Sequence, residues 1–76
     1  MNEHLKDITI PKNEVPMVAY FNEKHEHLFE LTQHKITGVF TLYKVVDNTL
    51  QRLGSADSPP KLEARFNVDK TLKESD

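Results

Sequence analysis

Hydrophobic and polar residues alternate along much of this chain, most clearly between residues 36 and 53. From Ile36 to Val46 the even positions form one side of an extended strand and the odd positions form the other. Asp47 and Asn48 interrupt the alternation, and both residue types tolerate the positive φ of a two-residue hairpin turn. The pattern predicts a β-hairpin whose return strand ends by Gly54.

The turn length sets the register of this hairpin. A three-residue turn would place Lys44 opposite Arg52, and like charges directly opposite each other are destabilising. We therefore expect the two-residue turn. The cross-strand pairs expected from it are Val45 with Leu50, Tyr43 with Arg52, and Leu42 with Leu53.

Two further strands are predicted before this hairpin. Residues 15–21, VPMVAYF, carry apolar side chains on both faces of an extended chain, and the polar residues 22–26 separate them from a second strand over 27–33. Pro11 and Pro16 exclude a helix longer than two turns near the N-terminus, so a short edge strand over Asp7–Ile10 is expected instead. The residues expected to form one core face are Met17, Phe21, Phe29, Leu31, Phe40, Leu42 and Leu53.

The segment after the loop GSADSPP fits two structures. Apolar and polar residues alternate from Lys61 to Val68, which predicts a strand. Ser58 followed by Pro59 is typical of a helix start, and one or two helical turns are the alternative. We expect the strand, and we expect residues 1–6 and 69–76 to be frayed.

These elements predict one small domain over residues 1–76, because a chain of 76 residues is too short to bury two cores. The expected fold is all-β, with five or six short strands in meander order forming a small barrel or a packed sheet. The alternative is an α+β domain with one short C-terminal helix.

No pattern of catalytic residues is present, and we expect no enzyme activity. The chain has no cysteine and two glycines, which excludes thiolate chemistry and glycine-rich phosphate loops. Ser55 and Ser58 lie in a loop without the strand-turn-helix frame of a catalytic serine. His25 and His27 lack a third ligand at a recognised spacing, so we expect no metal site and no cofactor.

The core assignment leaves a second apolar face, which determines the functional prediction. Its expected members are Val18, Tyr20, Leu28, Val39, Tyr43 and Val45. Such a face must be closed over by the sheet itself, covered by the C-terminal segment as a helix, or buried against another subunit. We predict a non-enzymatic protein-binding module, a regulator, inhibitor or assembly component. It would dock an apolar, tyrosine-bearing sheet face or a strand edge onto a larger protein or a second copy in a homodimer. The predicted binding residues are Tyr20, Val39, Tyr43, Val45 and Arg52.

The alternative function is single-stranded nucleic-acid binding by a small β-barrel, with bases stacked on Tyr20 and Tyr43 beside Lys44 and Arg52. Residues 37–54, TGVFTLYKVVDNTLQRLG, resemble the first half of an Sm-like RNA-binding barrel, with a glycine before alternating hydrophobics and an Asp-Asn turn. The acidic and asparagine positions that hold the base in that family have no matching spacing here, so no Sm site is transferred. A formal net charge of -2 also gives no overall basic field.

The expected location is the cytoplasm. The absence of cysteine fits a reducing compartment, and the sequence shows neither the apolar region of a signal peptide nor an apolar run long enough to span a bilayer. No membrane association is expected.

Overall fold

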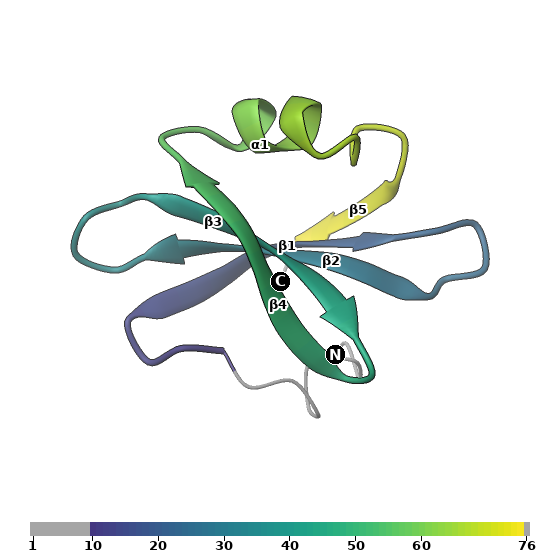
Figure 1. Ribbon diagram of the computed structural model, residues 1–76, viewed down its shortest axis with the longest axis horizontal. Helices are drawn as coiled ribbons and strands as arrows, with labels where there is room; N and C mark the ends of the chain where they lie inside the picture. Colours follow the sequence, from purple (N-terminus) through teal and green to yellow (C-terminus); the bar gives the residue numbers. More distant parts are fainter. Residues whose placement is uncertain (1–9, 76) are drawn as a thin grey trace.

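The computed structural model describes residues 10–75, which form a five-stranded antiparallel sheet and one short helix (Figure 1). The order of the strands across the sheet is β4-β3-β2-β1-β5. The first four strands follow each other as a meander, and β5 returns after the helix to pair with β1. The elements are β1 (Glu14–Phe21), β2 (His27–His34), β3 (Phe40–Val46), β4 (Thr49–Ala56), α1 (Pro59–Arg65) and β5 (Leu72–Ser75).

The β1–β2 hairpin confirms the two strands expected before the central hairpin. Between them, the side chain of Asn22 accepts hydrogen bonds from the amides of Lys24 and Glu26 and holds the turn. The ladder has irregularities between Pro16 and Val18 and between Tyr20 and Phe21. Such bulges add a residue to one strand and increase the local twist. The strand expected over Asp7–Ile10 lies outside the described residues except for Ile10, which is not in a strand.

The β3–β4 hairpin confirms the two-residue turn. Asp47 and Asn48 have φ of 50° and 62°, the left-handed conformation that both residue types tolerate. The predicted register is confirmed at Val45–Leu50 and Tyr43–Arg52, but Leu42 pairs with Gly54 rather than with Leu53. A bulge shifts the register there, and β4 continues to Ala56.

The central strand begins four residues later than expected, at Phe40. Gly38 has φ of 76°, and its amide donates to the carbonyl of His34. The ring nitrogen Nδ1 of His34 accepts from the amides of Ile36 and Thr37. These bonds fold residues 35–39 into a turn although their hydrophobic pattern continues that of the strand.

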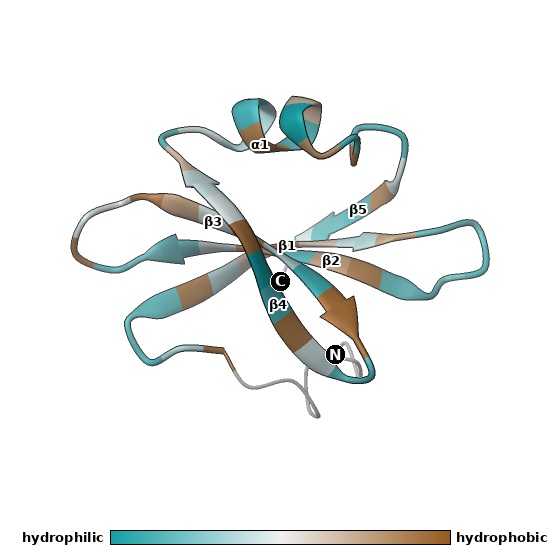
Figure 2. Cartoon of the chain, in the orientation of Figure 1, coloured by the Kyte–Doolittle hydropathy of each residue, from teal (hydrophilic) through white to brown (hydrophobic). Residues whose placement is uncertain are grey.

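The strand expected from Lys61 to Val68 is wrong, because helix α1 spans Pro59–Arg65. Ser58 is extended, with φ of -148° and ψ of 147°, and prolines occupy the first helical turn. The helix places Leu62 and Phe66, four residues apart, on the side that meets the sheet. Figure 2 shows apolar colour at the base of α1, on the side that faces the sheet. The short C-terminal helix of the α+β alternative is therefore present.

The C-terminal segment expected to be frayed instead contains β5, so this expectation is wrong for Leu72–Ser75. These residues pair with β1, from Phe21 opposite Leu72 to Val18 opposite Ser75. The polar sequence of β5 hides its role, because β5 buries no side chain and contributes backbone pairing to an otherwise open edge.

The core lies between α1 and one face of the sheet, which we call the helix face. Its fully buried members are Tyr20, Leu31, Leu42, Leu62 and Val68. Phe40 and Leu42 confirm the even-numbered side of the central strand as the core side. Met17 is 36 % exposed and Phe21 stacks on His27, so neither belongs to this core. The bulge between Pro16 and Val18 exchanges the two sides of β1 and brings Tyr20 into the core instead.

The face of the sheet opposite α1, which we call the polar face, carries polar side chains in matching positions of neighbouring strands. Thr32 lies opposite Thr41, and Glu30 lies opposite Tyr43. All four are buried. No helix in the described part of the chain is long and apolar enough to cross a membrane.

Candidate functional site

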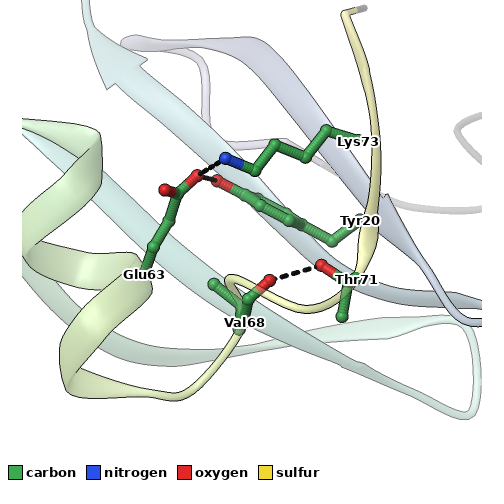
Figure 3. Close-up of polar contacts among 5 residues, drawn as sticks. All are labelled: Tyr20, Glu63, Val68, Thr71 and Lys73. Carbon is green, nitrogen blue, oxygen red and sulfur yellow. Dashed lines mark hydrogen bonds and ion pairs between the residues drawn. The ribbon is translucent and has the colours of Figure 1, made fainter.

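Tyr20 is a core residue and not a surface residue. Its ring is fully buried and meets Phe29 edge to face, with the ring centres 6.4 Å apart. Its hydroxyl donates to Oε2 of Glu63 at 2.9 Å, and Nζ of Lys73 lies 2.6 Å from the same oxygen (Figure 3). Burial and then the hydrogen bond to the Glu63 carboxylate raise the pKa of Tyr20. Tyr20 thus joins β1, α1 and β5.

Tyr43 lies on the polar face and is 6 % exposed. Its hydroxyl donates to Oε1 of Glu14 at 2.6 Å, and the hydroxyl of Thr32 donates to the same oxygen at 2.6 Å. Burial, followed by the hydrogen bond to Glu14, raises the pKa of Tyr43 to about 12. Both predicted tyrosine platforms are therefore enclosed by the fold, on opposite faces of one sheet.

Replacing Glu14 with alanine should lower the free energy of unfolding by about 1–3 kcal/mol, because it leaves the half-buried hydroxyls of Thr32 and Tyr43 without their acceptor. Urea unfolding followed by circular dichroism measures the change. Glu74→Ala, at an exposed position of β5, is the control and should differ from the wild type by less than about 0.5 kcal/mol. Equal losses in the two variants would contradict the role of Glu14.

The remaining predicted binding residues do not all lie together. Val39 is 37 % exposed and lies in the turn before β3, apart from the others. Val45 is half-buried near the other end of that strand, and the register places it diagonally opposite the exposed Arg52 on β4. The premise that Tyr20 shares a face with Val39, Tyr43 and Val45 is wrong, because the bulge in β1 moves Tyr20 to the helix face. Within residues 10–75 the surplus apolar face expected from the sequence does not form, since one face of the sheet packs against α1 and the other carries buried polar groups.

Among residues 10–75 the histidines do not form a common metal site. His25 is exposed in the β1–β2 turn, whereas His27, the first residue of β2, is buried. Its Nε2 lies 3.0 Å from Oε1 of the buried Glu30, and its ring stacks on Phe21. Within residues 10–75 no group of three or more histidine, aspartate or glutamate side chains could hold a metal ion.

An open groove of about 530 Å³ lies between the β1–β2 turn and the start of β5. Its rim alternates lysine and glutamate side chains of opposite sign, which gives no single charge for a ligand to match. The lining residues are Phe21, Asn22, Glu23, Lys24, Glu26, Lys70, Thr71 and Leu72.

Arg52 marks a different feature, the outer edge of β4. Its Nη2 donates to Oγ of Ser55 at 2.8 Å, and this hydroxyl lies 2.9 Å from Oγ1 of Thr41. The chain of contacts fixes the guanidinium on the polar face, beside the strand. On the helix face, a Cβ built on Gly54 would lie 3.8 Å from Nη1 of Arg65. The two arginines therefore flank β4 from opposite faces.

Sequence reasoning identified Arg52 but not Arg65. In a strand over residues 61–68, Arg65 would point outward with Lys61 and Glu63, away from any neighbour. The helix instead brings it over Gly54, where the absence of a side chain leaves room for both Phe66 and the guanidinium. Gly54, the one glycine in the edge strand β4, is the sequence signal that another part of the chain approaches closely here.

Comparison of this chain with protein-family models, with curated proteins and with solved structures finds no match. The resemblance to Sm-like barrels therefore rests on residues 37–54 alone.

Proposed function

We propose that this protein is a non-enzymatic binding module that accepts an extended segment of a partner protein along the outer edge of β4. This proposal rests on one observation, that the outer edge of β4 is unpaired in the described part of the chain. Within residues 10–75, β4 is the last strand on its side of the sheet, runs for eight residues and pairs through one side, with β3. An unpaired edge of this length is a template for strand addition.

The two outer edges of the sheet differ in protection. β5 has four residues, of which Lys73 and Glu74 are charged, and short charged strands resist further pairing. β4 has eight residues with one charge, Arg52, and no proline. The bulge at Leu53 is its single irregularity. This contrast favours β4 as the edge open to a partner.

The turn geometry identifies the backbone groups that a partner would meet. A two-residue turn closes with a hydrogen-bonded pair, here Val46 with Thr49, and bonded and non-bonded pairs alternate from that point. Gln51 therefore directs its amide and carbonyl groups toward β3. Leu50 and Arg52 direct theirs outward, where an added strand would bond to them.

The nucleic-acid alternative loses its main support, because Tyr20 and Tyr43 are 0 % and 6 % exposed and their rings are not available for stacking. Docking through a tyrosine-bearing sheet face loses its support for the same reason, because it also requires exposed tyrosine rings. The sequence predicts docking through a sheet face or through a strand edge, and the strand edge is the site that remains exposed. Arg52 is the predicted binding residue that lies on this edge. We also propose a cytoplasmic location, on the ground that the sequence contains no cysteine.

The test compares Leu50→Pro with Leu50→Ala. Proline removes the outward N–H but leaves the β3 ladder intact, a position at which edge strands tolerate proline. Alanine removes the side chain and keeps the N–H. We expect both variants to fold, and we expect Leu50→Pro alone to lose the partners that the wild type captures from a lysate.

Amide exchange supplies the site-specific readout. In the free protein the amides of Leu50 and Arg52 should exchange quickly and that of Gln51 slowly, and partner binding should protect the first two. A captured partner that leaves the exchange of Leu50 and Arg52 unchanged, or that still binds Leu50→Pro with wild-type affinity, would place the interface elsewhere and refute strand addition at β4.

A further inference from the structure

The charges around β4 indicate what kind of segment this edge accepts. Arg52 and Arg65 are both exposed. Among residues 10–75 the ion pairs join Lys61 with Asp57, Lys73 with Glu63 and His27 with Glu30. Neither arginine has a carboxylate within ion-pairing distance in this part of the chain. Two guanidinium groups thus flank β4 and are available to a partner.

The acidic residues that flank β4 in the sequence do not neutralise this edge. Asp57 follows the strand and contacts Nζ of Lys61 at 2.7 Å, and this hydrogen bond lowers the pKa of Asp57. Asp47 lies at the other end, in the turn. Lys44, opposite Gln51 on β3, is exposed and adds a third positive charge beside the strand. The edge is therefore locally basic in a chain whose formal net charge is -2.

We infer that the segment added to β4 is acidic and carries two carboxylates that point to opposite faces of the extended sheet, one toward Arg52 and one toward Arg65. This inference rests on the proposed function. Successive residues of a strand point to opposite faces. The two carboxylates must therefore be neighbours in the partner sequence, or three residues apart, and a spacing of two would place both on the same face.

The same charges disfavour a second copy of this chain as the occupant. Pairing two β4 edges about a two-fold axis would bring two copies of Arg52 and two of Arg65 to one seam. Like charges close together across paired strands are destabilising. The homodimer expected from the sequence is thus not the occupant that this edge favours.

Three capped peptides test the inference with the full chain. In TSVEEVST the glutamates are neighbours, TSEVEVST has the same composition with the glutamates two apart, and TSVQQVST is neutral. Affinities come from amide chemical shift changes of β4 in NMR titrations at low salt. We expect TSVEEVST to bind about 2- to 5-fold more tightly than TSEVEVST and about 5- to 20-fold more tightly than TSVQQVST, as two exposed charge contacts allow.

Variants assign the effect to the arginines. Arg52→Gln should reduce the logarithm of the affinity ratio between TSVEEVST and the other two peptides by about half, and Arg65→Gln should reduce it by the other half. The double variant should bind the three peptides equally. Lys70→Gln, which removes an equal charge from the segment between α1 and β5, is the matched control and should keep the preference.

The outcomes separate the two proposals. Equal binding of all three peptides at β4 would overturn the acidic preference and leave strand addition standing. Equal binding of the two glutamate isomers, both tighter than the neutral peptide, would overturn the two-face arrangement. Failure of every peptide to shift β4 amides would count against strand addition itself as well as the inference. A single-stranded oligothymidylate that binds Arg52 and Arg65 more tightly than TSVEEVST would overturn the protein-segment proposal in favour of a nucleic acid.

Discussion

Leu62→Ala should lower the free energy of unfolding by about 2–5 kcal/mol, because Leu62 is fully buried between α1 and the sheet. The total stability of a chain of this length is of the order of 4–11 kcal/mol, so this loss would be a large part of it. Urea unfolding followed by far-UV circular dichroism gives the change. Leu62→Met, which nearly conserves volume, should cost less than about 1.5 kcal/mol.

Ala64→Lys is the control that distinguishes helix from strand. In α1 residue 64 is exposed, so lysine should change stability by less than about 0.5 kcal/mol. In a strand over residues 61–68, Leu62 and Ala64 would share the buried face, and lysine would be as damaging as Leu62→Ala. Comparable losses in the two variants would therefore contradict α1.

Alkaline pH should unfold the protein in one cooperative step above pH 10. In the folded state the pKa of Tyr43 is raised to about 12, chiefly by burial and then by the hydrogen bond to Glu14. The same two causes, with Glu63 as acceptor, raise the pKa of Tyr20 further. In the unfolded chain both hydroxyls ionise near pH 10. The unfolded state then binds fewer protons, so stability falls as pH rises, by about 1.4 kcal/mol per pH unit for each tyrosine.

The chain suits this measurement because it contains two tyrosines and no tryptophan. Tyrosinate absorbance near 295 nm should appear together with the loss of circular dichroism. In Tyr43→Phe the dependence of stability on pH between 10 and 12 should be shallower by about 1.4 kcal/mol per unit, whatever the variant's stability at neutral pH. Ionisation of both tyrosines near pH 10 in a still-folded protein would show that the hydroxyls are not enclosed.

Buried tyrosines and an open edge define what this fold offers to a partner. Tyr20 joins the sheet to α1 through Glu63, Tyr43 joins β3 to β1 through Glu14, and the two rings are buried and unavailable for contacts with a partner. What stays accessible is backbone and charge along β4. Strand addition there would extend the five-stranded sheet by one strand without rearranging its core.

The candidate site could be predicted from the sequence only in part. Arg52 was placed correctly opposite Tyr43, because both lie close to a turn whose type follows from Asp47 and Asn48. Arg65 could not be placed, because its position over Gly54 depends on how α1 packs on the sheet.

The sequence by itself determined the β1–β2 and β3–β4 hairpins, and for β3–β4 also the turn and the register near it. Those features follow from local backbone preferences, such as positive φ at Asp47 and Asn48, and from alternation over a few residues. Tertiary structure alone decided which face of β1 is buried. A bulge that follows Pro16 in β1 exchanged its two faces, and alternation of apolar and polar residues does not by itself reveal a bulge. Residues 61–68 satisfy both a helical and a strand pattern. The part up to Arg65 is helical, and the helix packs over Leu31 and Leu42 on one face of the sheet. The polar β5 formed because the edge of β1 offered it backbone hydrogen bonds.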